Sequence, residues 1–339
     1  TANSTTGKIL TVLISYSATY AYKYKSEEHG LEWEEEAKTM YIDILNRAYI
    51  EAYVLIGFYF ADFYQFDREW IIGKIEEFVQ LDDNKWNSFF LGGYIYGNRP
   101  SNKYVYSLFY PHYQRAVENS SSLELSQAHG LNRHLLTFYL WGLENLEEGG
   151  LFQSYLKNIS PSLALDLIQW ICANERDLNT ISMEIRNKTF EKVLNLWTYL
   201  SDKYDNRNES EDLKVKMDLY RLIAFTPKLD LQYTKLLLRA SSISDRHFFT
   251  RFLFKDLVRL KTEGEPFETA KYLAQILDSI LLNPTTVFHY ISPTNQSYII
   301  DLVSFLFENG QQERACNLCE ELAKHGHDFI RETYYKYMS

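Results

Sequence analysis

The sequence has little glycine, proline or cysteine. Its 339 residues include 14 Gly and 7 Pro, together about 6% of the chain where average usage would give roughly 12%. So small a supply of turn residues argues against a turn-rich all-β fold. The 3 Cys residues are too few to cross-link a secreted scaffold, which favours a cytoplasmic location. With 35 Lys and Arg against 45 Asp and Glu, binding to nucleic acid by phosphate neutralisation is disfavoured.

Apolar runs of membrane-spanning length are also missing. The two longest runs, residues 9–22 and 52–61, carry hydroxyl side chains or are closed by acids. Ten apolar residues span only about 15 Å as a helix, which is half of a bilayer core. We therefore interpret both runs as buried helices and expect no membrane partner. Because the chain begins at Thr1 rather than Met, we expect it to be a fragment of a longer polypeptide.

Helical periodicity is abundant. Apolar residues recur at helical spacing between turn signals, which predicts an all-α fold of irregular antiparallel helix pairs, stacked as an α-solenoid or superhelical bundle. Residues 31–67 are predicted to form one helix, or two joined near Gly57. Tyr favours strands, but we predict that the Tyr-rich stretch 94–113 is helical rather than a hairpin. The other predicted helices cover residues 69–79, 85–96, 101–117, 122–145, 151–157, 162–174, 180–202, 212–224, 230–240, 244–261, 266–282, 296–308, 311–325 and 328–337.

Composition suggests three domains. Residues 1–113 hold 26 of the 54 aromatic residues, so large rings are expected to fill the core of that region. Gly310, followed five residues later by Ala315, resembles the turn and the small crossing residue of a tetratricopeptide hairpin. The polar segment 201–212 is expected to be an exposed connection. The predicted domains are an aromatic-rich helical domain at 1–120, helical pairs at 121–205, and tetratricopeptide- or HEAT-like helical pairs at 206–339.

Two cysteines and two histidines near the C-terminus have some metal-ligand character. Cys316 and Cys319 have the C-x2-C spacing common in zinc sites, and His325 and His327 follow them. The pair falls inside a predicted helix, however, and the arm from Cys319 to His325 is short. A redox pair of the thioredoxin kind would need a preceding strand, which the sequence does not indicate. We favour buried apolar thiols and predict no metal and no cofactor, with a zinc-containing helical protein through Cys316 and Cys319 as an alternative.

Catalytic motifs do not stand out. The sequence contains no H-E-x-x-H and no G-x-S-x-G. The glycine-containing segment 92–99, with Gly92, Gly93 and Gly97 followed by Asn98 and Arg99, lacks the lysine and the preceding strand of a phosphate loop, so we interpret it as a helix end. We predict no enzyme activity and no catalytic residue. An (α/α) toroid that acts on glycosides through paired carboxylates is the enzyme alternative, although such toroids carry their acids on glycine-bearing loops, and glycine is scarce here.

Two groups of residues are candidates for partner binding. The first is part of a tyrosine cluster with more hydroxyls than a core readily satisfies, and tyrosine is favoured at protein interfaces. The second is a basic row at i, i+4 and i+8 that could bind an acidic partner, although the solvated face of an amphipathic helix is the simpler interpretation. The tyrosines are Tyr104, Tyr106 and Tyr110, and the basic residues are Arg251, Lys255 and Arg259.

Three segments carry a family resemblance. Residues 133–171 look like a helix that ends in a Trp/Tyr-x-Gly-Leu run, followed by a Leu-Phe turn and a new helix after Pro. Residues 187–200 look like a helix centred on Trp197, and residues 315–335 like a closing helix followed by Gly and Asp-Phe. Together these segments resemble the helical C-terminal regions of large bacterial antiphage-defence proteins. In that group an effector or NTPase module, sirtuin-like or of the STAND type, precedes a long array of irregular helix pairs.

The resemblance implies a recognition or autoinhibitory array rather than a catalyst, and it assigns no site residue. We therefore expect a sensor or scaffold region of a larger bacterial protein, with a role in antiphage defence. Its expected partners are a protein ligand, with a phage protein as the candidate, and the rest of its own polypeptide.

Overall fold

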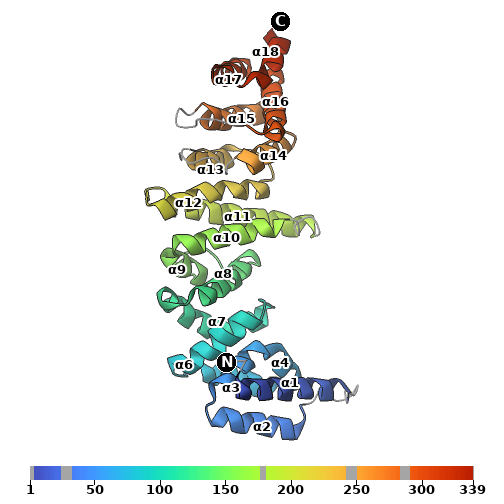
Figure 1. The fold of residues 1–339 in the computed structure, drawn as a ribbon, viewed down its shortest axis with the longest axis vertical. Helices are drawn as coiled ribbons and strands as arrows, with labels where there is room; N and C mark the ends of the chain where they lie inside the picture. The colour runs from blue at the N-terminus through green and yellow to red at the C-terminus, as the bar shows by residue number, and fades with distance from the viewer. Residues whose placement is uncertain (1–3, 24–32, 176–180, 242–249, 283–290, 339) are drawn as a thin grey trace. The chain divides into compact units, whose positions relative to one another are not determined.

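The computed structural model describes residues 4–23, 33–175, 181–241, 250–282 and 291–338. Within these ranges the fold is all-α, as the periodicity predicts. Helices α1 to α18 are joined by turns, short 3-10 segments and one π-helix, and the described residues contain no strand (Figure 1). None of the described helices combines the length and the apolar character that crossing a bilayer requires.

Two compact units make up the chain, unit 1 at Thr1–Ile159 and unit 2 at Ser160–Ser339. The division coincides with neither of the boundaries drawn from composition, at 120/121 and at 205/206. The polar segment 201–212 lies within unit 2. Its middle, residues 205–211, is exposed as expected, but Ser201 and Tyr204 are buried as part of a helix.

Local signals explain where the helices begin and which faces they bury. Pro266 starts one helix directly after Glu265, whose carboxylate accepts the backbone N–H of Glu268 at 2.9 Å. A proline in the first turn loses no helical hydrogen bond, and the preceding acid satisfies a free N–H. Along the same helix Leu273 and Leu277 are fully buried, one turn apart on its inner face.

Unit 1 is built from short helices. The sequence-based expectation for residues 31–67 is wrong, because three helices occupy that span: the first break lies at Ala48, whose φ of 60° is left-handed, and the second at Tyr59. The elements are α1 (Thr5–Lys23), α2 (Glu35–Asn46), α3 (Ile50–Phe58), α4 (Phe60–Phe66), α5 (Arg68–Phe78), α6 (Asp83–Trp86), the π-helix η1 (Asn87–Ile95), α7 (Lys103–Glu118), η2 (Ser120–Ser122), α8 (Leu125–Leu140) and α9 (Leu151–Asn158).

Helix α3 packs closely against η1 through two glycines. A Cβ at Gly57 would lie 2.1 Å from the carbonyl oxygen of Phe89, and a Cβ at Gly93 would lie 2.3 Å from the carbonyl oxygen of Val54. No larger residue fits where backbone meets backbone at this distance. The interpretation of the glycine-containing segment 92–99 as a helix end agrees with the structure, because the helical run ends at Gly97. Gly92 and Gly93 lie inside η1, and Gly93 is at its crossing with α3.

Aromatic rings fill the core of unit 1, as its composition predicts. Tyr94 stacks on Phe109 with ring centroids 3.7 Å apart. Two buried histidines lie among the rings. His112 accepts the indole N–H of Trp86 at Nδ1 (2.9 Å), and His134 is hydrogen-bonded to a tyrosine hydroxyl and a backbone carbonyl. Burial lowers the pKa of both imidazoles to about 4, so the core holds them neutral.

In unit 2, many helices pack on the next but one: α11 packs on α13, α13 on α15, α15 on α17, and α14 on α16 (Figure 1). Some also pack on their neighbours in sequence, such as α15 on α16 and α16 on α17. Such contacts build a stack of helices. The elements are α10 (Pro161–Ala173), α11 (Met183–Tyr204), α12 (Ser210–Leu219), η4 (Tyr220–Phe225), α13 (Leu231–Ser241), α14 (Thr250–Leu260), α15 (Pro266–Leu281), α16 (Pro293–Glu308), α17 (Gln312–Lys324), η5 (Asp328–Ile330) and α18 (Arg331–Met338).

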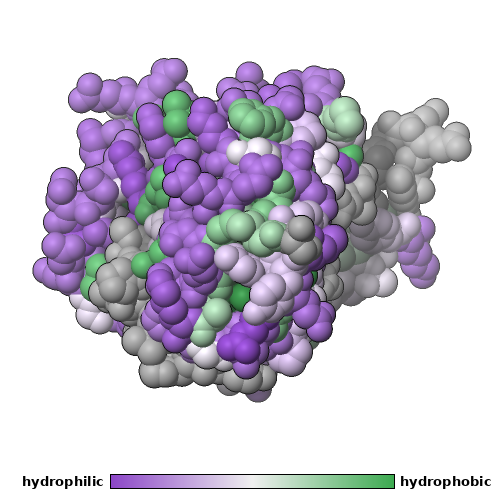
Figure 2. Space-filling model, turned by 90° about the horizontal axis from the view of Figure 1, so that it is seen from above, coloured by the Kyte–Doolittle hydropathy of each residue, from purple (hydrophilic) through white to green (hydrophobic). Residues whose placement is uncertain are grey.

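The end of unit 2 at which α17 and α18 lie is mostly hydrophilic. Figure 2 views the molecule from that end, and the hydrophobic surface there is divided into small separate patches. This end therefore offers no large continuous hydrophobic surface in that view.

Candidate partner-binding groove between α13 and α15

The first turn of α13 is fixed by an acidic cap. The Asp230 carboxylate oxygen Oδ1 accepts the backbone N–H groups of Gln232 (2.9 Å) and Tyr233 (3.0 Å), and its carbonyl oxygen accepts the hydroxyl of Thr234 at 2.6 Å. These bonds satisfy N–H groups that a helix start leaves without helical partners. As a result Leu231, the first helical residue, is held in a fixed position at the surface, with 54% of its area exposed.

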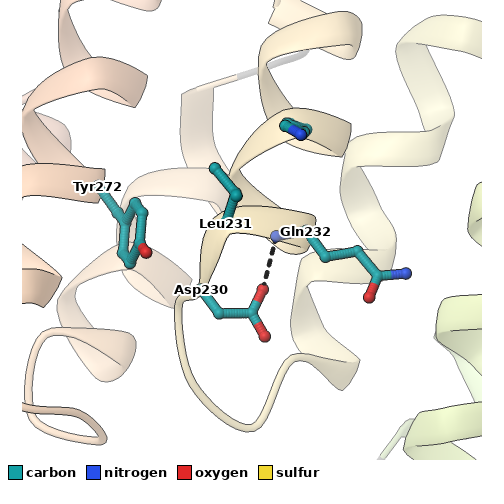
Figure 3. Close-up of a pocket in the computed structure, with 5 residues that line it drawn as sticks. Asp230, Leu231, Gln232 and Tyr272 are labelled. Atoms are coloured by element: carbon teal, nitrogen blue, oxygen red, sulfur yellow. Dashed lines mark hydrogen bonds between the residues drawn. The ribbon is translucent and has the colours of Figure 1, made fainter.

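An open cavity of about 470 Å³ lies beside this turn. We call it the α13–α15 groove. Its lining is Asp230, Leu231, Gln232 and Lys235 from the start of α13 and Tyr272 from α15. In Figure 3 the Leu231 side chain and the Tyr272 ring lie on the same side of this turn, and Gln232 is directed away from Tyr272.

The lining combines apolar surface with polar groups that give direction. Leu231 and the half-exposed ring of Tyr272 can cover an apolar side chain of a ligand, while Lys235 can pair with an acid and Gln232 can bond to a peptide group. Among the described residues of the lining there is no histidine or cysteine. The apolar surface beside Lys235 is complementary to a peptide segment that carries one apolar and one acidic side chain.

The predicted tyrosines do not form one surface. Tyr104 is exposed, and its ring lies 5.1 Å from the guanidinium carbon of Arg68. Tyr106 is buried, because its hydroxyl donates to the buried carboxylate of Glu144. Burial, followed by the bond to that carboxylate, raises the pKa of Tyr106 well above its usual value. Tyr110 is half-buried and packs edge-on against Tyr106. The prediction that Tyr106 contacts a partner is thus wrong: a residue distant in sequence satisfies its hydroxyl inside the core.

The predicted basic row is divided as well. The side chain of Arg251 lies outside the described residues, and Lys255 is exposed on α14. Arg259 instead donates to the carbonyl oxygens of Thr226 at 3.1 Å and Ile223 at 3.2 Å, at the end of η4. Carbonyl groups at a helix end have no helical donor and attract a cation. Arg259 therefore closes a contact within unit 2 while its side chain stays 39% exposed, and partner binding by Arg259 stays a prediction.

The cysteine and histidine candidates are not gathered into a ligand set. Cys319 is buried in α17, and burial raises the pKa of its thiol to about 12. The Cys316 sulfur lies 3.2 Å from the sulfur of Met338. His325 is exposed, with Nδ1 2.8 Å from the carbonyl oxygen of Glu321. Over the described part of the chain, no group of three or more His, Cys, Asp or Glu residues is arranged to hold a metal ion.

Sequence reasoning missed the groove residues, although one signal was present. The inner face of α13 is marked by buried Tyr233, Leu236 and Leu237, and Leu231 falls outside that stripe. A large apolar residue off the buried stripe is a candidate contact residue. The position of Tyr272 beside it has no local signal, because it depends on how α15 stacks on α13.

Comparison with known proteins adds no relative. No protein-family model matches the sequence, and neither the curated proteins nor the solved structures contain a significant match.

Proposed function

We propose that this chain is a protein-recognition region, a sensor or scaffold of a larger bacterial protein, and that it binds its protein ligand at the α13–α15 groove. The observation that carries the proposal is the groove itself: Leu231 and Tyr272 present apolar surface beside Lys235, on two helices that stack directly on each other. Binding energy in protein interfaces is concentrated in such apolar and aromatic anchors. No bond-making step is assigned to the chain.

Stacking supplies a route by which binding is relayed. A ligand held between α13 and α15 fixes their spacing. Both helices are tied to the next helix of their layer by an ion pair, α13 to α11 through Arg239 and Asp202 (2.6 Å) and α15 to α17 through Arg314 and Asp278 (3.4 Å). Because each helix contacts only near neighbours, a change in one spacing shifts the next helix pair. The rest of the polypeptide is the proposed recipient of that change.

Antiphage defence is the proposed setting. Its support is the resemblance of residues 133–171, 187–200 and 315–335 to the helical arrays of such proteins. In that setting the ligand is a phage protein, and an effector elsewhere in the polypeptide responds to it. The acidic balance of the chain, with net charge −10, agrees with a protein ligand rather than nucleic acid.

The test is titration of the labelled full chain against a broad panel of purified phage proteins. A true ligand binds the wild type, and Leu231→Asp weakens it about tenfold or more, because an unpaired carboxylate replaces an apolar anchor. Leu125→Asp is the matched control. Leu125 is also the first residue of a helix after an acidic cap and is 63% exposed, but it lies in unit 1, so its variant should bind as the wild type does.

Two results would count against the proposal. The first is the absence of any complex across the panel. The second is a ligand whose affinity is reduced equally by Leu231→Asp and by Leu125→Asp, since the groove would then have no special part in binding. Circular dichroism of each variant confirms that it remains folded, which is expected because both leucines are exposed.

A further inference from the structure

Helix α1 is apolar on two faces and buries only one. Leu10, Ile14 and Ala21 are buried against unit 1, where α1 packs on α2, α3 and α4. From the sequence we interpret residues 9–22 as a buried helix, and for the opposite face this is wrong. Ile9 is 54% exposed, Val12 69% and Tyr16 53%.

These exposed residues form a regular row, which we call the α1 outer stripe: Ile9, Val12 and Tyr16. Their spacing of i, i+3 and i+7 places them on one side of the helix. Rows with this spacing are the anchors by which one helix packs on another. A single exposed apolar residue needs no explanation, but a contiguous row on a soluble protein marks an interaction site.

The charge of α1 identifies the kind of partner. The helix carries no acidic residue between Thr5 and Lys23, and its charged residues are Lys8 and Lys23, in a chain of net charge −10. If two copies paired through this stripe, both helices would bring basic residues and no acidic residue to the contact. Like charges at close range oppose association. A helix with acidic residues beside its apolar row has the complementary charge.

We propose that the α1 outer stripe is a docking site for an amphipathic helix of another protein, one that flanks its apolar row with acidic residues. The site belongs to unit 1 and shares no residue with the α13–α15 groove, so it stands whether or not that groove binds a ligand. With both sites, the chain holds one partner on each unit, which is the arrangement of a scaffold.

The test uses the full chain and two synthetic helical peptides. Both peptides carry leucines at i, i+3, i+4 and i+7; one has glutamates beside the leucine row and the other has lysines. Fluorescence anisotropy should show saturable binding of the glutamate peptide. Val12→Glu should weaken that binding about tenfold or more, because it buries an unpaired charge of the same sign as the peptide's. Lys8→Glu should shift the preference toward the lysine peptide, by about twofold to fivefold as for a surface ion pair.

Met183→Glu is the control variant. Met183 is 73% exposed on α11 of unit 2, so the same kind of substitution there should leave peptide binding unchanged. Val12 is the most exposed of the three stripe residues, so Val12→Glu is expected to fold, and circular dichroism checks this.

Four results would overturn the proposal. Equal binding of both peptides, or binding that Val12→Glu does not change, would show that the stripe is not the docking site. Light scattering that detects a wild-type dimer and a Val12→Glu monomer would show that a second copy covers the stripe. Sedimentation with phosphatidylglycerol vesicles that is lost in Val12→Glu would show that the stripe meets a lipid surface.

Discussion

Acidification should destabilise unit 1 through its two buried histidines. At His112, Nδ1 accepts the indole N–H of Trp86 and Nε2–H donates to the carbonyl oxygen of Ile75, both at 2.9 Å. An indole can only donate and a carbonyl can only accept, so these partners fix the neutral Nε2–H tautomer. Burial is the main cause of the lowered pKa of His112, and the positive charge of Arg115 nearby lowers it further. A proton added at Nδ1 would also point at the N–H of Trp86.

His134 resembles His112 in burial but differs in its partners. Its Nε2–H donates to the carbonyl oxygen of Asn98 at 2.9 Å, and its Nδ1 lies 2.7 Å from the hydroxyl of Tyr113. That hydroxyl can rotate from donor to acceptor. Desolvation, rather than a fixed donor, is therefore the main cause of its lowered pKa.

The size of the stability loss follows from the difference between the folded and unfolded pKa values of the two histidines. Each imidazole has a pKa of about 4 when folded and about 6.5 when unfolded. The unfolded state therefore binds protons first, and the free energy of unfolding falls as the pH drops from about 6.5 to about 4, with no further loss from these groups below that. At pH 5 the loss is about 2 kcal/mol for each histidine, and the full loss is about 3 kcal/mol each.

The assay is urea unfolding of the full chain at pH 7.5 and pH 5, followed by hydrogen exchange of peptides from α7 and α8. The unfolding midpoint of these peptides should fall at pH 5 in the wild type. It should fall much less in the double variant His112→Gln, His134→Gln, whose side chains do not titrate. His325→Gln, at an exposed histidine of unit 2, should behave as the wild type. Equal pH sensitivity of the wild type and the double variant, or a ring pKa near 6.5 by NMR, would refute the reasoning.

Two further predictions concern packing. Gly93→Ala should destabilise unit 1 by about 3 kcal/mol or more, because the new Cβ would meet the backbone of Val54. Gly73→Ala, with nothing within 4 Å of its Cβ, should stabilise α5 by up to about 1 kcal/mol. Thermal unfolding of both variants checks this, and similar melting temperatures would contradict it. Arg259→Met should lower the free energy of unfolding by about 1 to 3 kcal/mol, because two carbonyl groups lose their donor. Lys255→Met should leave that free energy nearly unchanged. Equal urea midpoints for these two variants would argue against the capping role of Arg259.

The positions of the helices could be predicted from the sequence because their signals are local. The predicted helix 266–282 corresponds to α15 at Pro266–Leu281, and the predicted helix 311–325 to α17 at Gln312–Lys324. Proline at a first turn, Gly310 with φ of 79° between two helices, and apolar residues at helical spacing all act within a few residues. The all-α fold follows from such signals alone.

The roles of polar side chains could not be predicted in the same way. The buried hydroxyl of Tyr106 donates a hydrogen bond to Glu144, and the guanidinium of Arg259 donates to the carbonyl oxygen of Thr226 at the end of η4. Each partner is more than thirty residues away in sequence. The close approach at Gly93 likewise depends on how α3 packs on η1. Hydrophobic periodicity reports which face of a helix is buried, but not which side chains the fold brings to it.

Candidate binding surfaces can be predicted only in part from the sequence, because only part of the evidence for them is local. Leu231 and Val12 both lie outside the buried stripe of their helix, and this can be read from the sequence. Leu125 is just as exposed, so an apolar residue off the stripe is not informative by itself. What distinguishes a surface is a second apolar side chain beside the first. Ile9 and Val12 lie beside each other because of their spacing along one helix, whereas Tyr272 lies beside Leu231 only because α15 stacks on α13. A sequence can therefore indicate a docking stripe on one helix, but a groove between two helices requires their packing.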